Sequence, residues 1–192
     1  HGASIVNVQS TAFLRYSRIF KRKSGEGMGV KVSVVTDNDI KPNSGLTEEQ
    51  ITEKRTEKEA KYNWQDIKTF ISPDWTLEYD ISLSTLRKEF YTAALRAEKI
   101  QNSDTYGLTP AKITEVNQTV ETDFTTWTLE HKTGQEIAKA IYVDYMLKKE
   151  ISKAIVAQCF AALLKGCEGI KERIEVDEKL KYLVDTIKYV TE

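Results

Sequence analysis

The sequence predicts an α/β protein in which a small parallel sheet is followed by a helical module. Residues 30–36 (VKVSVVT) and 67–72 (IKTFIS) are rich in β-branched residues and typical of strands, and a strongly charged helical segment lies between them. From residue 84 onward apolar side chains recur every three or four positions, which indicates helices. We therefore expect an α/β domain at residues 1–83 and a helical domain at residues 84–192.

The composition is typical of a folded, water-soluble protein. Of 192 residues, 40% are hydrophobic and 30% are charged, and the net charge is −1. No run approaches the roughly 18 apolar residues of a membrane span, and no signal-peptide pattern opens the chain. We expect no membrane partner and a cytoplasmic location. The near-neutral total does not by itself indicate a nucleic-acid partner.

The two cysteines, Cys159 and Cys167, lie eight residues apart in one helical pattern. That spacing corresponds to about 12 Å along a helix, beyond the roughly 7 Å limit for a disulfide. Only His1 and His131 could join them as zinc ligands, so a zinc site is disfavoured. We expect two buried free thiols.

Two elements are predicted before the first strand. Residues 4–8 (SIVNV) have strand character, and residues 11–23 form a helical pattern that the breaker run 24–29 (SGEGMG) ends. With the strand at 4–8 included, the order β-α-β-α-β predicts a parallel layer. The helix has a basic flank, which could follow a phosphate backbone or simply face solvent, made of Arg15, Arg18, Lys21, Arg22 and Lys23.

The helix between the two strands should begin at Thr47, where Glu49 or Gln50 is placed for a capping box. Its many charges predict an exposed helix. The strand at 30–36 is almost continuously apolar, which predicts coverage on both of its faces.

Within the helical module, the first helix has an apolar stripe made of Leu86, Phe90, Ala93, Ala97 and Ile100. Residues 102–110 form a loop, a long helical pattern runs over 137–163, and a last amphipathic helix spans 176–190.

Asp37 and Asp39 directly follow the strand at 30–36. In open α/β sheets, ligands gather at the carboxyl ends of the strands. An extended Asp-x-Asp places both carboxylates on one side of the backbone, where their repulsion favours a cation between them. Hard oxygen ligands at this spacing suit Mg²⁺ or Mn²⁺. The alternative is a polar turn, because Asp and Asn favour turns.

Residues 74–81 (DWTLEYDI) alternate polar and apolar side chains. This period of two predicts an extended segment with Thr76 and Glu78 on one face. If that face meets the end of the earlier strand, Glu78 joins Asp37 and Asp39 in an acidic cluster. The alternative is an ordinary half-buried strand whose polar side faces water.

Lys132 stands directly before a predicted helix. Thr133 and Glu136 form a Thr-x-x-Glu capping box, so the helix should begin at Gly134. The N–H groups of a helix N-terminus already favour an anion, so a lysine at this place is consistent with a nearby phosphate or carboxylate. The alternative is a lysine that faces solvent.

These motifs occur in an order that resembles a known family. VTDND, then WTLEYD, then a lysine ahead of an alanine-rich helix is similar to the C-terminal region of OLD-family (overcoming lysogenization defect) nucleases. Residues 2–20 also resemble that family's segment before its Asp-x-Asp strand, so the resemblance covers roughly residues 2–140. It implies a Toprim-like parallel sheet and metal-dependent DNA endonuclease activity. Similar proteins, including the nuclease subunit of Gabija anti-phage systems, join an ABC-type ATPase to a Toprim domain.

The resemblance also implies roles for single residues. Asp37 and Asp39 match the Toprim Asp-x-Asp and would ligate a metal, while Glu78 would hold a second metal with help from Thr76. Lys132 would steady charge on the scissile phosphate. The implied chemistry is two-metal phosphodiester hydrolysis, with Mg²⁺ or Mn²⁺ ions about 3.5–4 Å apart. The implied partners are DNA, an ATPase domain of the same protein and further copies in a homo-oligomer.

Two parts of the family pattern have no counterpart in this sequence. The strand that ends in a glutamate is missing upstream of residue 4, and no GxxxxGK[ST] phosphate loop occurs. The chain therefore looks like a fragment of a longer protein, or one piece of a split one, with an incomplete Toprim-like sheet. As it stands, we expect it to bind metal weakly and not necessarily to cut DNA alone. The second hypothesis is a non-catalytic helical assembly or dimerisation module. A receiver or phosphatase-type α/β domain fits less well, because Lys132 precedes a helix instead of ending a late strand.

Overall fold

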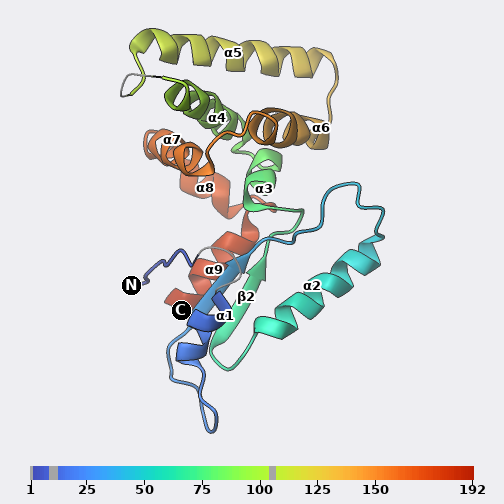
Figure 1. Ribbon diagram of the computed structural model, residues 1–192, viewed down its shortest axis with the longest axis vertical. Coiled ribbons are helices and arrows are strands. Elements are labelled where there is room, and N and C mark those ends of the chain that lie inside the picture. The colour runs from blue at the N-terminus through green and yellow to red at the C-terminus, as the bar shows by residue number, and fades with distance from the viewer. Residues whose placement is uncertain (1, 9–12, 104–106) are drawn as a thin grey trace. The chain divides into compact units, whose positions relative to one another are not determined.

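The computed structural model describes residues 2–8, 13–103 and 107–192 and has a mixed α/β structure with a two-stranded parallel sheet (Figure 1). By their contacts the residues form two units. The first unit contains the sheet and comprises His1–Leu77 and Leu180–Glu192, and the second is Glu78–Lys179. The contacts thus assign the last helix to the sheet unit, whereas the predicted domains, 1–83 and 84–192, placed it in the helical module.

The sheet consists of strands β1 (Val32–Thr36) and β2 (Ile67–Ile71), joined by helix α2 (Glu48–Tyr62). The strands pair in parallel, with Val34 opposite Thr69, so the predicted parallel β-α-β unit is confirmed. The strand predicted at residues 4–8 is wrong, because residues 2–8 have no regular secondary structure. Ile5 there is 98% exposed, and no described strand pairs with this segment.

The two faces of the sheet are covered unequally. On one face Val34 packs with Tyr62 and Ile67 in a small buried cluster. On the other, helix α9 (Lys181–Thr191) lies along both strands and packs Tyr189 against Phe70, with ring centroids 6.1 Å apart. Val35 nevertheless stays 44% exposed, so the prediction that the first strand is covered on both faces is wrong at this residue. A single β-α-β unit with one further helix is too narrow to cover it.

The remaining elements of the first unit follow local signals in the sequence. Helix α1 (Phe13–Ser17) and the short 3-10 helix η2 (Arg18–Phe20) lie within the helix predicted over 11–23. Residues 11 and 12 lie outside the described residues, and residues 21–23 are not helical. Helix α2 begins at a capping box in which the side chains of Thr47 and Gln50 accept each other's backbone N–H groups, so Gln50 is the partner.

The second unit is helical. It is built from α3 (Leu77–Leu83, whose first residue belongs to the first unit), α4 (Arg87–Gln101), α5 (Pro110–Leu129), α6 (Gly134–Ala138), the π-helix η3 (Lys139–Leu147), α7 (Lys153–Lys165) and α8 (Ile170–Glu175). The predicted stripe of α4 is buried from Leu86 to Ala97, and α4 packs against α5 and α7. The long helical pattern predicted over 137–163 is interrupted before α7, where Glu150 has a φ of 51°.

The cysteines are free thiols, as expected, although both are half-buried instead of fully buried. Residues 104–106 of the predicted loop lie outside the described residues. Across the described ranges, every helix is too short or too polar to cross a lipid bilayer.

Candidate functional site

Residues 37–39 lie directly after β1, at the carboxyl end of the parallel sheet, as predicted. They do not continue the strand. Asp39 has a φ of 65°, in the left-handed region that Asp tolerates better than most residues. We expected an extended backbone that turns both carboxylates to one side, and this expectation is wrong. The strand ends at Thr36, and Asp39 has a left-handed backbone conformation.

Hydrogen bonds join this turn to the loop that follows β2. The N–H groups of Asn38 and Asp39 both donate to the carbonyl of Trp75, at 3.0 and 3.2 Å. The Asn38 N–H also lies 2.8 Å from Oγ of Ser72, and both residues are buried. Thr76, which is 8% exposed, follows Trp75 directly. The ends of the two strands are thus held together by hydrogen bonds, of which the one between Asn38 and Ser72 is buried.

Asp37 binds the start of helix α3. Its Oδ1 accepts a hydrogen bond from the N–H of Leu77, the first residue of the helix, at 3.0 Å. The prediction that residues 74–81 are extended is wrong, and Glu78 lies in the first helical turn. The first N–H groups of a helix have no partner within the helix, and a carboxylate at that end stabilises it. The alternation of polar and apolar residues over 74–81 could not reveal that a carboxylate at the end of β1 would cap a helix in this segment.

A cation does lie beside the two aspartates, and it belongs to Lys58 of α2. Its Nζ is 2.6 Å from Oδ2 of Asp39 and 2.6 Å from the backbone carbonyl oxygen of Asp37. The side chain of Lys58 is 21% exposed and that of Asp39 is 73% exposed. The sequence treated α2 as an exposed charged helix, so nothing in its pattern distinguished Lys58 from the neighbouring lysines.

Glu78 forms an ion pair in the second unit. Nζ of Lys153 lies 2.9 Å from Oε1 of Glu78, whose side chain is 18% exposed. Burial alone would lower the pKa of Lys153, but the hydrogen bond and charge of Glu78 outweigh it and raise that pKa. Sequence reasoning missed Lys153. The sequence did hold one indication of it: the family pattern has a lysine ahead of an alanine-rich helix, and Lys153 begins the alanine-rich helix α7.

Lys132 has different neighbours. It forms an ion pair with Glu130 at 3.0 Å, and its Nζ lies 5.9 Å from the ring centroid of Trp127. The capping box that follows it is confirmed: Oγ1 of Thr133 accepts the N–H of Glu136, and Oε2 of Glu136 accepts the N–H of Thr133. The role of Lys132 toward a phosphate stays a prediction.

The predicted site residues are thus divided between the two units. Asp37, Asp39 and Thr76 belong to the first unit, and Glu78 and Lys132 belong to the second. Their predicted roles stay predictions.

Within the residues that the structure describes, no three or more His, Cys, Asp or Glu side chains form a metal-binding group. The donors of the first unit still suit a weakly held Mg²⁺ or Mn²⁺. Asp37 and Asp39 offer carboxylate oxygens, Thr76 offers a hydroxyl oxygen, and the ammonium of Lys58 already marks a place that favours a cation. Mg²⁺ is commonly held by one or two carboxylates, with waters and substrate phosphates completing its shell.

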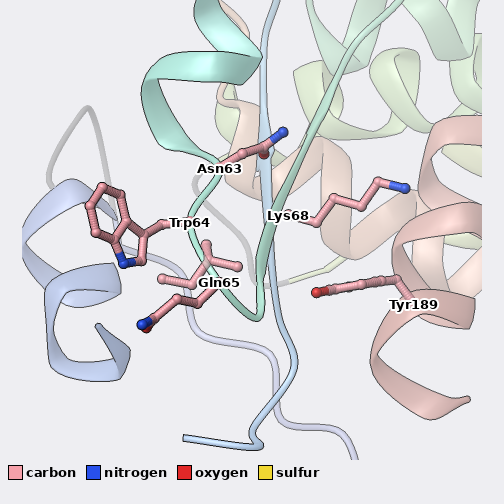
Figure 2. Close-up of a pocket in the computed structure, with 6 residues that line it drawn as sticks. Asn63, Trp64, Gln65, Lys68 and Tyr189 are labelled. Carbon is pink, nitrogen blue, oxygen red and sulfur yellow. The ribbon is translucent and has the colours of Figure 1, made fainter. Parts of the chain in front are cut away.

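A hollow of about 410 Å³ lies at the other end of β2 (Figure 2). Figure 2 shows Trp64 and Gln65 on one side of the strand, and Lys68 extending toward Tyr189 on the other. The amide of Gln65 donates to the carbonyl of Gly25 at 3.2 Å, and the hydroxyl of Tyr189 donates to the carbonyl of Asp66 at 2.9 Å. The residues that line this hollow include no carboxylate, so we place the candidate site at the carboxyl ends of the strands, where Asp37 and Asp39 lie.

The fold defines the chain as a mixed α/β protein with one parallel β-α-β unit and a helical unit. Comparison with protein families, curated proteins and solved structures found no match.

Proposed function

We propose that this chain is the metal-dependent DNA endonuclease module of an OLD-family, Toprim-type nuclease. The main support is the position of Asp37 and Asp39 at the carboxyl end of a parallel strand, hydrogen-bonded to the loop that carries Thr76. Ligands of open α/β sheets gather at this end. The ordered motifs that resemble the OLD family give the second support.

In this proposal the side chains have distinct tasks. The carboxylates of Asp37 and Asp39 would hold one divalent ion, and Glu78 would hold another with help from Thr76. When bound, Mg²⁺ or Mn²⁺ would supply a more acidic water and charge stabilisation at the phosphate. A lysine ammonium compensates charge that develops on the scissile phosphate. Lys153, which contacts Glu78, joins Lys132 as a candidate for that task.

The proposal includes partners and a location. The partners are DNA, an ATPase domain of the same protein and further copies in a homo-oligomer. The proposed location is the cytoplasm.

The test is nicking of supercoiled plasmid with Mn²⁺ or Mg²⁺. It compares this chain, a version extended upstream by a glutamate-ending strand of the kind that the family resemblance implies, and the extended version carrying Asp37→Asn or Asp39→Asn. We expect nicking by the extended protein and a loss of about 100-fold or more in either variant, as when one charge-stabilising group is removed from an active site. Glu53→Gln on the exposed face of α2 is the matched control for losing one carboxylate, and it should nick normally.

Two outcomes would count against the proposal. Undiminished nicking by folded Asp39→Asn would show that the activity comes from elsewhere. Absence of nicking in every folded version would favour the non-catalytic assembly module, which size-exclusion chromatography with light scattering would then reveal as a stable oligomer.

A further inference from the structure

The ammonium group of Lys58 contacts oxygen atoms beside which a metal ion at this site would have to bind. Its Nζ lies 2.6 Å from the carboxylate of Asp39 and 2.6 Å from the carbonyl of Asp37. A divalent ion bound to the same carboxylate would stand within a few ångströms of the ammonium. Two positive charges this close together repel each other, and the repulsion is stronger where water is scarce.

We infer that Lys58 is a built-in competitor of the divalent ion: its ammonium neutralises Asp39 in the metal-free protein and leaves Asp39 when Mg²⁺ or Mn²⁺ binds. This inference rests on the proposed function, because it requires Asp37 and Asp39 to be metal ligands. The inference gives Lys58 a role that no sequence motif indicated. It also makes the affinity for the divalent ion depend on a side chain of helix α2.

The geometry allows Lys58 to leave without unfolding its helix. Helix α2 is held at its start by the Thr47 capping box and at its end by Tyr62, which is 6% exposed. Lys58 lies between these two points on a flexible four-carbon stem. The carboxylate of Asp39 is 73% exposed, so water and ions reach it directly.

The backbone conformation of Asp39 determines which substitution can remove its charge without disturbing the turn. Its φ of 65° is tolerated by Asn and strained for Ala, so Asp39→Asn removes the charge with little effect on the turn. For Lys58, methionine keeps the length and apolar stem of the side chain and removes only the ammonium. Lys54→Met is the matched control, because Lys54 is an exposed lysine one turn earlier on the same helix.

The experiment is isothermal titration of the metal-free protein with Mn²⁺, without DNA and at constant ionic strength. We expect Lys58→Met to bind Mn²⁺ about fivefold to tenfold more tightly than the wild type, the change that follows from removing one nearby repulsive charge. Lys54→Met should change the affinity by less than about twofold, because its charge is farther away and screened. Asp39→Asn should weaken binding strongly.

Thermal unfolding of the same proteins gives an independent readout. Without metal, Lys58→Met should melt at a lower temperature than the wild type, since Asp39 loses its counter-ion. With saturating Mn²⁺ the variant should gain more in melting temperature than the wild type does. A purely structural lysine would lower both melting temperatures equally and leave the affinity unchanged.

The outcomes separate this inference from the proposed function. If Asp39→Asn abolishes Mn²⁺ binding but Lys58→Met binds like the wild type, the metal site stands and competition by Lys58 is refuted. If Asp39→Asn binds Mn²⁺ like the wild type, the proposed site itself is wrong. If neither the wild type nor Lys58→Met binds Mn²⁺ at millimolar concentration, both are refuted.

Discussion

The carboxylate of Asp37 accepts a hydrogen bond from the N–H of Leu77 at 3.0 Å, so a residue at the end of β1 caps the start of helix α3. One of the two aspartates proposed to bind metal therefore also has a structural task. Substitutions of Asp37 must be judged by stability as well as by activity.

Asp37→Ala is expected to lower the free energy of unfolding by about 1 kcal/mol, the usual effect of losing a helix cap. Asp37→Asn should cost less, because the amide oxygen of asparagine can still accept the hydrogen bond from Leu77. Urea unfolding measures both values. Equal stability of Asp37→Ala and the wild type would show that the hydrogen bond to Leu77 does not stabilise α3.

A second prediction compares the two candidate lysines. Lys153 contacts Glu78 at 2.9 Å, whereas Lys132 contacts Glu130 at 3.0 Å. We expect Lys153→Met to reduce metal-dependent nicking by about 100-fold and Lys132→Met to reduce it less, because a group near an acidic site residue is better placed to compensate charge. Single-turnover nicking with the upstream-extended protein measures the rates, and Mn²⁺ titration tests whether metal binding is intact. A greater loss for Lys132→Met would reverse the assignment.

A third prediction concerns pH and Glu98 of α4. Lys149 lies 2.9 Å from Oε1 of Glu98, and the hydroxyl of Tyr145 donates to its other oxygen. Burial alone would raise the pKa of Glu98, but these hydrogen bonds and the nearby lysine charges lower it below its ordinary value. A carboxylate whose folded-state pKa is lowered stabilises the protein above its unfolded pKa of about 4.3, and that stabilisation disappears as the pH falls through the folded pKa.

The difference in free energy of unfolding between the wild type and Glu98→Gln should therefore be largest above about pH 5 and should shrink below about pH 4. Urea unfolding at a series of pH values measures it. A difference that stays constant between pH 3 and pH 7 would contradict the role of the charge. Asp144→Asn on η3 is a useful comparison, since hydrogen bonds from Lys139 and Lys148 also lower the pKa of Asp144.

A fourth prediction tests the core of the second unit. Phe90 is 3% exposed and meets the ring of Phe160 edge to face, with centroids 5.3 Å apart. Phe90→Ala should lower the free energy of unfolding by about 3–5 kcal/mol, because it removes a buried ring and leaves a cavity. Leu129→Ala is the control: Leu129 is 74% exposed, so its loss should change stability by less than about 0.5 kcal/mol. Urea denaturation compares the two, and a similar small effect for both would show that α4 and α7 do not pack as described.

Local signals determined several elements of this protein. β-branched runs predicted β1 and β2, and Thr-x-x-Gln and Thr-x-x-Glu patterns predicted the capping boxes that begin α2 and α6. The same kind of signal placed Asp37 and Asp39 at a strand end. These features depend on residues a few positions apart, which is the range that propensity and periodicity report.

Only the tertiary structure decided what surrounds those residues. The alternation of residues 74–81 predicted a strand, but Asp37 caps α3 there from the end of another strand. The partners of the acidic residues, Lys58 for Asp39 and Lys153 for Glu78, come from helices distant in the sequence. No period or spacing encodes such pairs, because a lysine on an exposed face has the same local sequence whether it meets water or a carboxylate. The sequence by itself determined which residues could carry charge at the strand ends, and the fold decided which cation each of them meets.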